Sequence, residues 1–180
     1  NKLGMYENPD RYTDVKKRDE VTLSENARTL VRKAAEESCV LLKNNGMLPL
    51  KETAKVAFVG PFAGEREIIG NWSKKAHIED TVSIRDGVEK LLKHAVPCAH
   101  GCSWKLFDTD ESGFEEAEKA CKDADYIVAC VGEHMLNSGE AHSRADIRIP
   151  EIQRKFIARL HKTNKPLCLV VFGGRPLALS

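Results

Sequence analysis

The sequence predicts an α/β domain built on an open, mostly parallel sheet with helices on both faces. Two observations predict it: short apolar segments alternate with helical patterns, and the apolar segments run into glycine. These segments lack polar alternation, as expected for parallel strands that are covered on both sides. The sequence offers four such strands, whereas doubly wound sheets usually hold about five or six. We therefore expect a domain that is cut short at its C-terminal end.

Each element is predicted from its own hydrophobic pattern. Buried strands are expected where continuous apolar runs end at a turn, at 55–59, 95–98, 126–131 and 166–172. Helices are expected where apolar residues recur at helical spacing, at 24–42, 81–93, 114–123 and 150–162. Ser24 is the expected N-cap of the first helix, and Asn44-Asn45-Gly46 is its expected stop. Residues 1–20 lack periodicity, so an extended connector is expected there.

The composition narrows the class of protein. Hydrophobic residues make up 42% of the 180 residues and charged residues 31%, which argues against a disordered chain. The 28 basic residues balance 27 acidic ones, so nothing favours a nucleic acid or an anionic membrane as partner. No apolar run approaches the roughly 20 residues that cross a bilayer. Most of the six cysteines lie in apolar stretches, which favours reduced thiols and a cytoplasmic location.

The turns that follow the predicted strands are the places to look for chemistry, because ligands of open α/β sheets bind beyond the carboxyl ends of the strands. The turn at Gly60-Pro61 carries neither the Gly-x-Gly-x-x-Gly fingerprint nor a Gly-Lys-Ser/Thr phosphate loop. A nucleotide cofactor is therefore not expected.

A long polar loop, residues 132–146, follows the third predicted strand. Its Glu133 and Glu140 are the residue types of a paired-carboxylate site, in which a retaining glycosidase holds two carboxyls about 5–5.5 Å apart. The spacing does not fix such a pair, and a solvated loop whose acids bind Arg144 and lysines explains the same residues. A metal site formed by His134, His142 and Glu140 is a third interpretation, beside neutral loop histidines.

Motifs spread in order over nearly the whole chain resemble those of glycoside hydrolase family 3, of the bacterial β-glucosidase type. Each motif is weak alone, but their order and spacing make the resemblance specific. They are Leu3-Gly4-Met5-Tyr6-Glu7-Asn8-Pro9, Ser38 to Asn44, Leu48-Pro49-Leu50, Val56 to Pro61, Gly70-Asn71-Trp72-Ser73, Val131-Gly132-Glu133, Ser138 to Arg144, Ile149-Pro150, Lys165-Pro166 and Gly174-Arg175-Pro176-Leu177.

The resemblance implies a catalytic unit of two domains, a TIM-like barrel followed by an α/β sandwich domain. Residues 1–50 would be the linker and helix that leave a missing N-terminal barrel, and residues 51–180 part of the C-terminal sandwich. In the family the barrel supplies an Asp nucleophile, whose motif this sequence lacks. Ser138-Gly139-Glu140 matches the family's acid/base loop. Glu140 is therefore the acid/base candidate, and Glu133, the first acid of the same loop, is the runner-up.

The implied activity is the retaining hydrolysis of terminal, non-reducing β-linked glucose, with a β-glucoside as substrate, the missing barrel as partner and no cofactor. This part alone would be inactive. Arg144 would brace the loop, contact substrate, or pair at the surface with Asp146 or Glu140. Trp72 would stack on a sugar ring or pack in the core. The alternatives are a β-xylosidase of the same family and a non-catalytic, flavodoxin-like binding module.

Overall fold

A computed structural model describes residues 2–73 and 77–179 of the chain. The chain divides into two compact units, Asn1–Leu48 and Pro49–Ser180. The first unit contains the helices α1 (Val15–Val21) and α2 (Glu25–Ser38). The second unit contains the whole sheet, and every site described below lies within it.

The first unit corrects two expectations. The expected extended connector contains the short helix α1, which begins where the Asp14 side chain accepts a hydrogen bond from the Lys17 backbone N–H. The predicted N-cap of α2 is confirmed, because the Ser24 side chain accepts from the Ala27 N–H. That helix ends earlier than expected, since Cys39 takes an extended conformation and the Ser38 hydroxyl donates to a carbonyl of the last turn.

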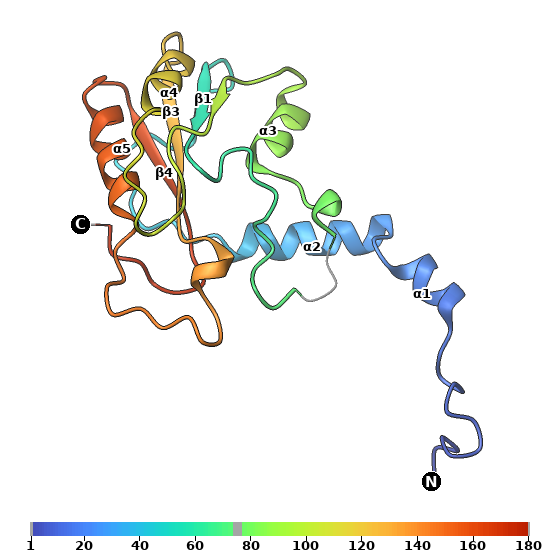
Figure 1. The fold of residues 1–180 in the computed structure, drawn as a ribbon. Coiled ribbons are helices and arrows are strands. Elements are labelled where there is room, and N and C mark those ends of the chain that lie inside the picture. The colour runs from blue at the N-terminus through green and yellow to red at the C-terminus, as the bar shows by residue number, and fades with distance from the viewer. Residues whose placement is uncertain (1, 74–76, 180) are drawn as a thin grey trace. The chain divides into compact units, whose positions relative to one another are not determined.

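The second unit confirms the predicted parallel sheet (Figure 1). Its strands are β1 (Val56–Val59), β2 (Cys98–Ala99), β3 (Tyr126–Gly132) and β4 (Leu167–Phe172), in the order β2-β1-β3-β4 with every pair parallel. The strand expected at 95–98 is reduced to two residues, because only Cys98 and Ala99 pair with β1. Neighbouring strands therefore bring their carboxyl ends to one edge of the sheet.

Helices cover both faces of the sheet, as predicted. Alternate strand residues such as Ile127 and Ala129 pack against α4 (Phe114–Ala120) and α5 (Glu151–His161). The residues between them, such as Val128 and Cys130, face α3 (Ile84–Leu92). This arrangement explains the continuous apolar runs of β1 and β3, which are buried on both sides, whereas β4 is half-buried along its length. Helix α3 begins at a capping box in which the Ser83 and Asp86 side chains accept from each other's backbone N–H groups.

One lysine joins α4 to β4. The Lys165 ammonium donates to the carbonyl oxygens of Cys121, Lys122 and Ala124, at 2.9, 2.6 and 2.6 Å. These carbonyls follow the last turn of α4, and the Cys121 oxygen also accepts from the Ala124 N–H at 3.2 Å. The ammonium adds a charged donor there and opposes the negative end of the helix dipole.

We expect Lys165→Met to lower the free energy of unfolding by about 1.5–3 kcal/mol, the range for hydrogen bonds to a charged group. Urea denaturation measures the loss. Lys162→Met is the matched control, because that side chain is exposed. Equal effects of the two substitutions would contradict a capping role for Lys165.

The six cysteines are free thiols. Burial raises the pKa of Cys102 and Cys130 to about 12, so both stay protonated and serve as small packing groups. Within the described ranges, no helix combines the length and the apolar character needed to span a membrane.

Candidate functional site

The candidate site begins where β3 ends. Gly132 has φ +129°, and an added Cβ would collide with the Phe172 carbonyl oxygen of β4, so only glycine fits. The buried Gln153 of α5 donates to the Gly132 carbonyl at 2.9 Å and accepts from its N–H at 2.7 Å. Glycine and glutamine together fix the direction in which the chain leaves the sheet.

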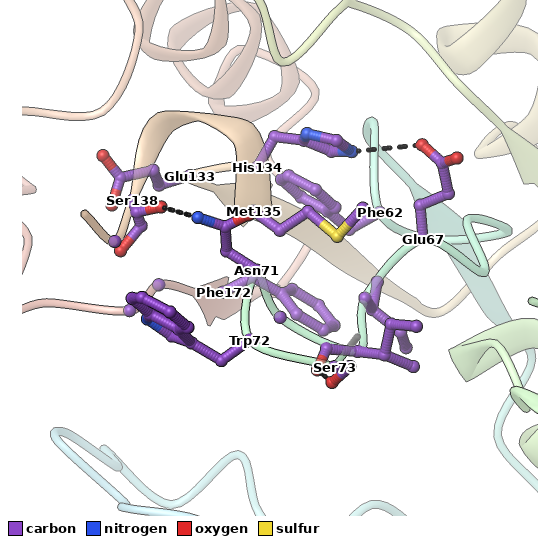
Figure 2. Close-up of a pocket in the computed structure, with 16 residues that line it drawn as sticks. Phe62, Glu67, Asn71, Trp72, Ser73, Glu133, His134, Met135, Ser138 and Phe172 are labelled. Carbon is purple, nitrogen blue, oxygen red and sulfur yellow. Dashed lines mark hydrogen bonds and ion pairs between the residues drawn. The ribbon is translucent and has the colours of Figure 1, made fainter. Parts of the chain in front are cut away.

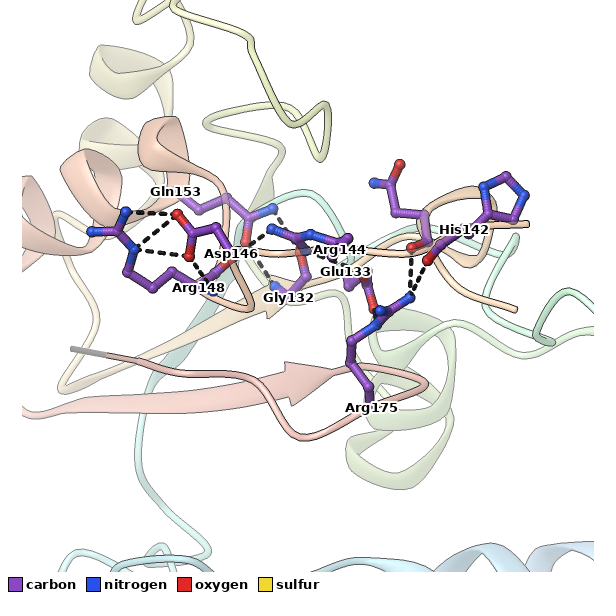
Figure 3. Close-up of polar contacts among 9 residues, drawn as sticks. Gly132, Glu133, His142, Arg144, Asp146, Arg148, Gln153 and Arg175 are labelled. Carbon is purple, nitrogen blue, oxygen red and sulfur yellow. Dashed lines mark hydrogen bonds and ion pairs between the residues drawn. The ribbon is translucent and has the colours of Figure 1, made fainter. Parts of the chain in front are cut away.

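The next residue, Glu133, is the centre of a buried ion-pair cluster (Figure 3). One carboxylate oxygen accepts from Arg144 Nη1 at 2.9 Å, and the other accepts from Arg175 Nε at 3.1 Å. The Glu133 side chain is 0% exposed, while Arg144 and Arg175 are 12% and 22% exposed. Each carboxylate oxygen therefore accepts from a different arginine, one within the loop and one in the segment that follows β4.

The two arginines also hold the loop backbone. Arg175 donates through Nη2 to the carbonyls of Asn137 and His142, at 3.0 and 2.8 Å. Arg144 donates to the Arg148 carbonyl at 2.8 Å. Arg144 thus pairs with the buried Glu133, and Asp146 pairs with Arg148 rather than with Arg144.

Glu140 lies at the far end of this loop, in a tight turn. The His142 N–H donates to the Gly139 carbonyl at 3.2 Å, so Glu140 and Ala141 are the two central residues of a β-turn. Ala141 has φ +62°, a left-handed conformation that is uncommon for a side-chain-bearing residue. Glu140 is exposed at the corner of this turn.

A pocket of about 420 Å³ opens beside the loop (Figure 2). It is lined by segments that leave β1, β3 and β4, including Glu67, Asn71, Trp72, Ser138, Gly139 and Gly174. The Asn71 amide donates to the Ser138 carbonyl at 3.1 Å, which joins the loop to the pocket wall. Trp72 is 62% exposed on this wall, so core packing was the wrong interpretation of that residue.

His134 is a buried residue of the pocket wall. Its ring stacks on Trp104 with centroids 3.8 Å apart, and its Nδ1 accepts from the Leu136 N–H. Burial lowers the pKa of His134, so the imidazole is neutral near pH 7 and carries its proton on Nε2. A metal site formed with His142 and Glu140 is not present, since no three His, Cys, Asp or Glu side chains gather suitably among the residues described.

Two residues of the site were missed by sequence reasoning. Arg175 follows β4, and Glu67 lies in the segment after β1, so both belong to connections at the same edge of the sheet as the loop. The parallel topology was the signal that could have found them, because neighbouring strands deliver their following residues to one place.

Comparisons with known proteins agree with this architecture. Residues 39–180 match the glycosyl hydrolase family 3 C-terminal domain. The periplasmic β-glucosidase of Salmonella typhimurium is 32% identical over 98% of this chain, which covers 26% of that protein. A β-xylosidase of Formosa agariphila is 31% identical over 99% of this chain, again covering 26% of the relative.

A solved structure shows the same fold. The β-glucosidase of Listeria innocua in complex with isofagomine superposes with a TM-score of 0.87 at 31% identity, over 97% of this chain and 24% of that one. The chain thus spans about a quarter of the length of these relatives. Because the family domain matches most of its length, the chain belongs to glycosyl hydrolase family 3.

Proposed function

We propose that this chain is the part of a retaining β-glycosidase that carries the acid/base residue, and that Glu140 is this residue. The enzyme hydrolyses terminal, non-reducing β-linked glucose. The observation that carries the proposal is the presentation of Glu140. Its side chain is exposed at the corner of a strained turn, on a loop that the buried Glu133 holds through Arg144 and Arg175.

The reaction needs two carboxylates, of which this chain provides one. An Asp on the N-terminal barrel of the same protein attacks the anomeric carbon, while Glu140 protonates the departing glycosidic oxygen. The resulting glycosyl ester is then hydrolysed: Glu140 removes a proton from water, and the water oxygen displaces the Asp carboxylate. Two displacements at one carbon restore the β configuration.

Glu133 is less suited to this role than Glu140. Both of its oxygens accept hydrogen bonds from arginine, and its side chain has no exposed surface. Protonation of Glu133 would remove the negative charge that pairs with the guanidiniums of Arg144 and Arg175, both of which are mostly buried. We therefore assign Glu133 and Arg144 to holding the loop, and Trp72, exposed on the pocket wall, to stacking on substrate sugar.

A β-xylosidase is the second candidate function. Relatives at 31–35% identity are named β-xylosidases, and others at similar identity are named β-glucosidases. Xylose lacks the hydroxymethyl group of glucose, and the sugar that reacts lies against the barrel. The acid/base role of Glu140 is the same in both enzymes.

We expect the full-length protein to hydrolyse an aryl β-glucoside or β-xyloside and to release the β-anomer first, as followed by proton NMR. The 180-residue chain alone should give no turnover, because it holds only one of the two carboxylates. First release of the α-anomer, or turnover by the chain alone, would overturn the proposal.

The six free cysteines support a cytoplasmic location, because such thiols persist in reducing compartments. The relative from Salmonella typhimurium is named a periplasmic enzyme. Assay of the activity in separated cytoplasmic and periplasmic fractions distinguishes the two locations.

A further inference from the structure

The loop that carries Glu140 begins beside a buried histidine that the proposed reaction does not use. His134 directly follows Glu133, and its side chain is 0% exposed. Its Nδ1 accepts a hydrogen bond from the Leu136 backbone N–H at 3.2 Å, at the start of the short 3-10 helix η2 (Met135–Asn137). A backbone N–H can only donate, so this contact exists only while Nδ1 carries no proton.

Segments that follow three different strands meet at this imidazole. The ring stacks on Trp104, which follows β2, with centroids 3.8 Å apart, and lies nearly parallel to Phe62, which follows β1, at 6.4 Å. Its Nε2 lies 3.5 Å from a carboxylate oxygen of Glu67 (Figure 2) and makes no hydrogen bond with the described residues. Packing therefore holds the ring of His134 in one orientation.

Two opposing effects act on the charge of His134. Burial favours the neutral ring and lowers its pKa, while the carboxylates of Glu67 and Glu65 favour the charged ring and oppose that shift. Burial is the larger effect, so the pKa lies below its ordinary value of 6.5. The aromatic neighbours carry no charge, and the charge of Glu133 is paired with two arginines. The closed loop therefore favours the neutral imidazole.

We propose that His134 is a positioning residue: its neutral imidazole holds the loop that carries Glu140, and its protonation releases that loop in acid. Protonation replaces the Nδ1 acceptor by an N–H group that faces the Leu136 N–H, so η2 loses the contact at its start. The consequence for turnover rests on the proposed function, whereas the opening of the loop does not.

The direction of the pH dependence follows from the two states of the ring. In an open loop the ring is hydrated and has its ordinary pKa of about 6.5, which is higher than its pKa in the closed loop. The closed loop is therefore favoured fully above about pH 6.5. Below that pH the ratio of closed to open loop falls by up to about tenfold per pH unit, until the pH passes the pKa of the closed state.

Hydrogen exchange of the full-length protein from about pH 7.5 to 5 tests this inference, with each rate divided by its intrinsic value at that pH. For residues 134–142 we expect constant protection above about pH 6.5 and the loss described above below it, while β3 stays protected. His134→Asn keeps an acceptor oxygen and does not titrate, so protection of the loop should not change with pH. His134→Leu fills a similar volume without an acceptor, so protection should be low at every pH.

Glu67→Gln tests the same linkage without a substitution in the core. Removing that carboxylate lowers the pKa of His134 further, so the loss of protection should continue to lower pH and become larger in total. His142→Asn is the matched control, because it removes a second histidine of the same loop and should keep the wild-type pH dependence.

The outcomes separate this inference from the proposed function. A loss that persists in His134→Asn, disappears in His142→Asn or is not larger in Glu67→Gln overturns the role of His134. Simultaneous loss of protection in β3 also overturns it, because the whole domain would then be unfolding in acid. The expected exchange pattern in a full-length protein without turnover overturns the proposed function alone.

Discussion

Replacing Glu140 with alanine in the full-length protein should lower kcat on a disaccharide by about 10²- to 10⁴-fold, the usual contribution of a positioned acid or base. The departing sugar alcohol then leaves without a proton, and water attacks the glycosyl ester without a base. On a substrate with a good leaving group, such as 2,4-dinitrophenyl β-glucoside, the first displacement no longer needs the acid. The slow step becomes hydrolysis of the ester.

Azide tests this interpretation directly. It is a small anion that attacks the glycosyl ester without general base catalysis, so it should restore turnover of the dinitrophenyl substrate and yield a β-glycosyl azide. Asp146→Ala is the matched control, because that carboxylate lies on the same loop but is bound to Arg148. Azide rescue of Glu133→Ala or Asp146→Ala, with none for Glu140→Ala, would show that the proton donor has been misassigned.

The second large effect is expected at Glu133. Glu133→Ala leaves Arg144 and Arg175 mostly buried without their carboxylate, and breaking a buried ion pair in this way costs about 3–5 kcal/mol. The loss should be local, because the arginines also hold the carbonyls of Asn137 and His142. We expect amides of residues 133–148 to exchange with solvent much faster while those of β3 stay protected, as measured by hydrogen exchange.

Glu133→Gln separates charge from shape at the same position. It keeps one acceptor oxygen and the volume of the side chain, so its effect on exchange should be smaller than that of alanine. Turnover should fall in both variants without rescue by azide, since the proton donor is displaced rather than removed. Wild-type exchange in Glu133→Ala would mean that the ion pairs do not hold the loop.

The sheet was predictable because its signal is local. Each predicted strand is a continuous apolar run. Such a run indicates burial on both faces, as found for β1 and β3. The two-residue strand at Cys98 and Ala99 shows where local signals weaken, since its length depends on pairing with β1. Helix α1 was missed because its seven residues carry apolar side chains only at the two ends, Val15 and Val21, so they show no helical periodicity.

The arrangement of the loop after β3, in contrast, could not be predicted from local sequence. Glu133 and Glu140 are the same residue type a few positions apart, yet one is buried against two arginines and the other is exposed. Arg175 is 42 positions from Glu133 in the sequence, and only the β3–β4 pairing brings them together. Glu67 reaches the pocket in the same way, through a strand neighbour rather than through sequence proximity.

The cluster around Glu133 has a consequence for engineering. Arg175 binds the loop by hydrogen bonds to the backbone carbonyls of Asn137 and His142. These contacts do not depend on the side chains at the two positions, because every residue has a backbone carbonyl. We therefore expect that residues 138–141, which lie between these two carbonyls, can be exchanged between related enzymes while the hydrogen bonds from Arg175 are kept. We expect a longer or shorter segment to reposition Glu140, the proposed proton donor, and to leave the underlying domain intact.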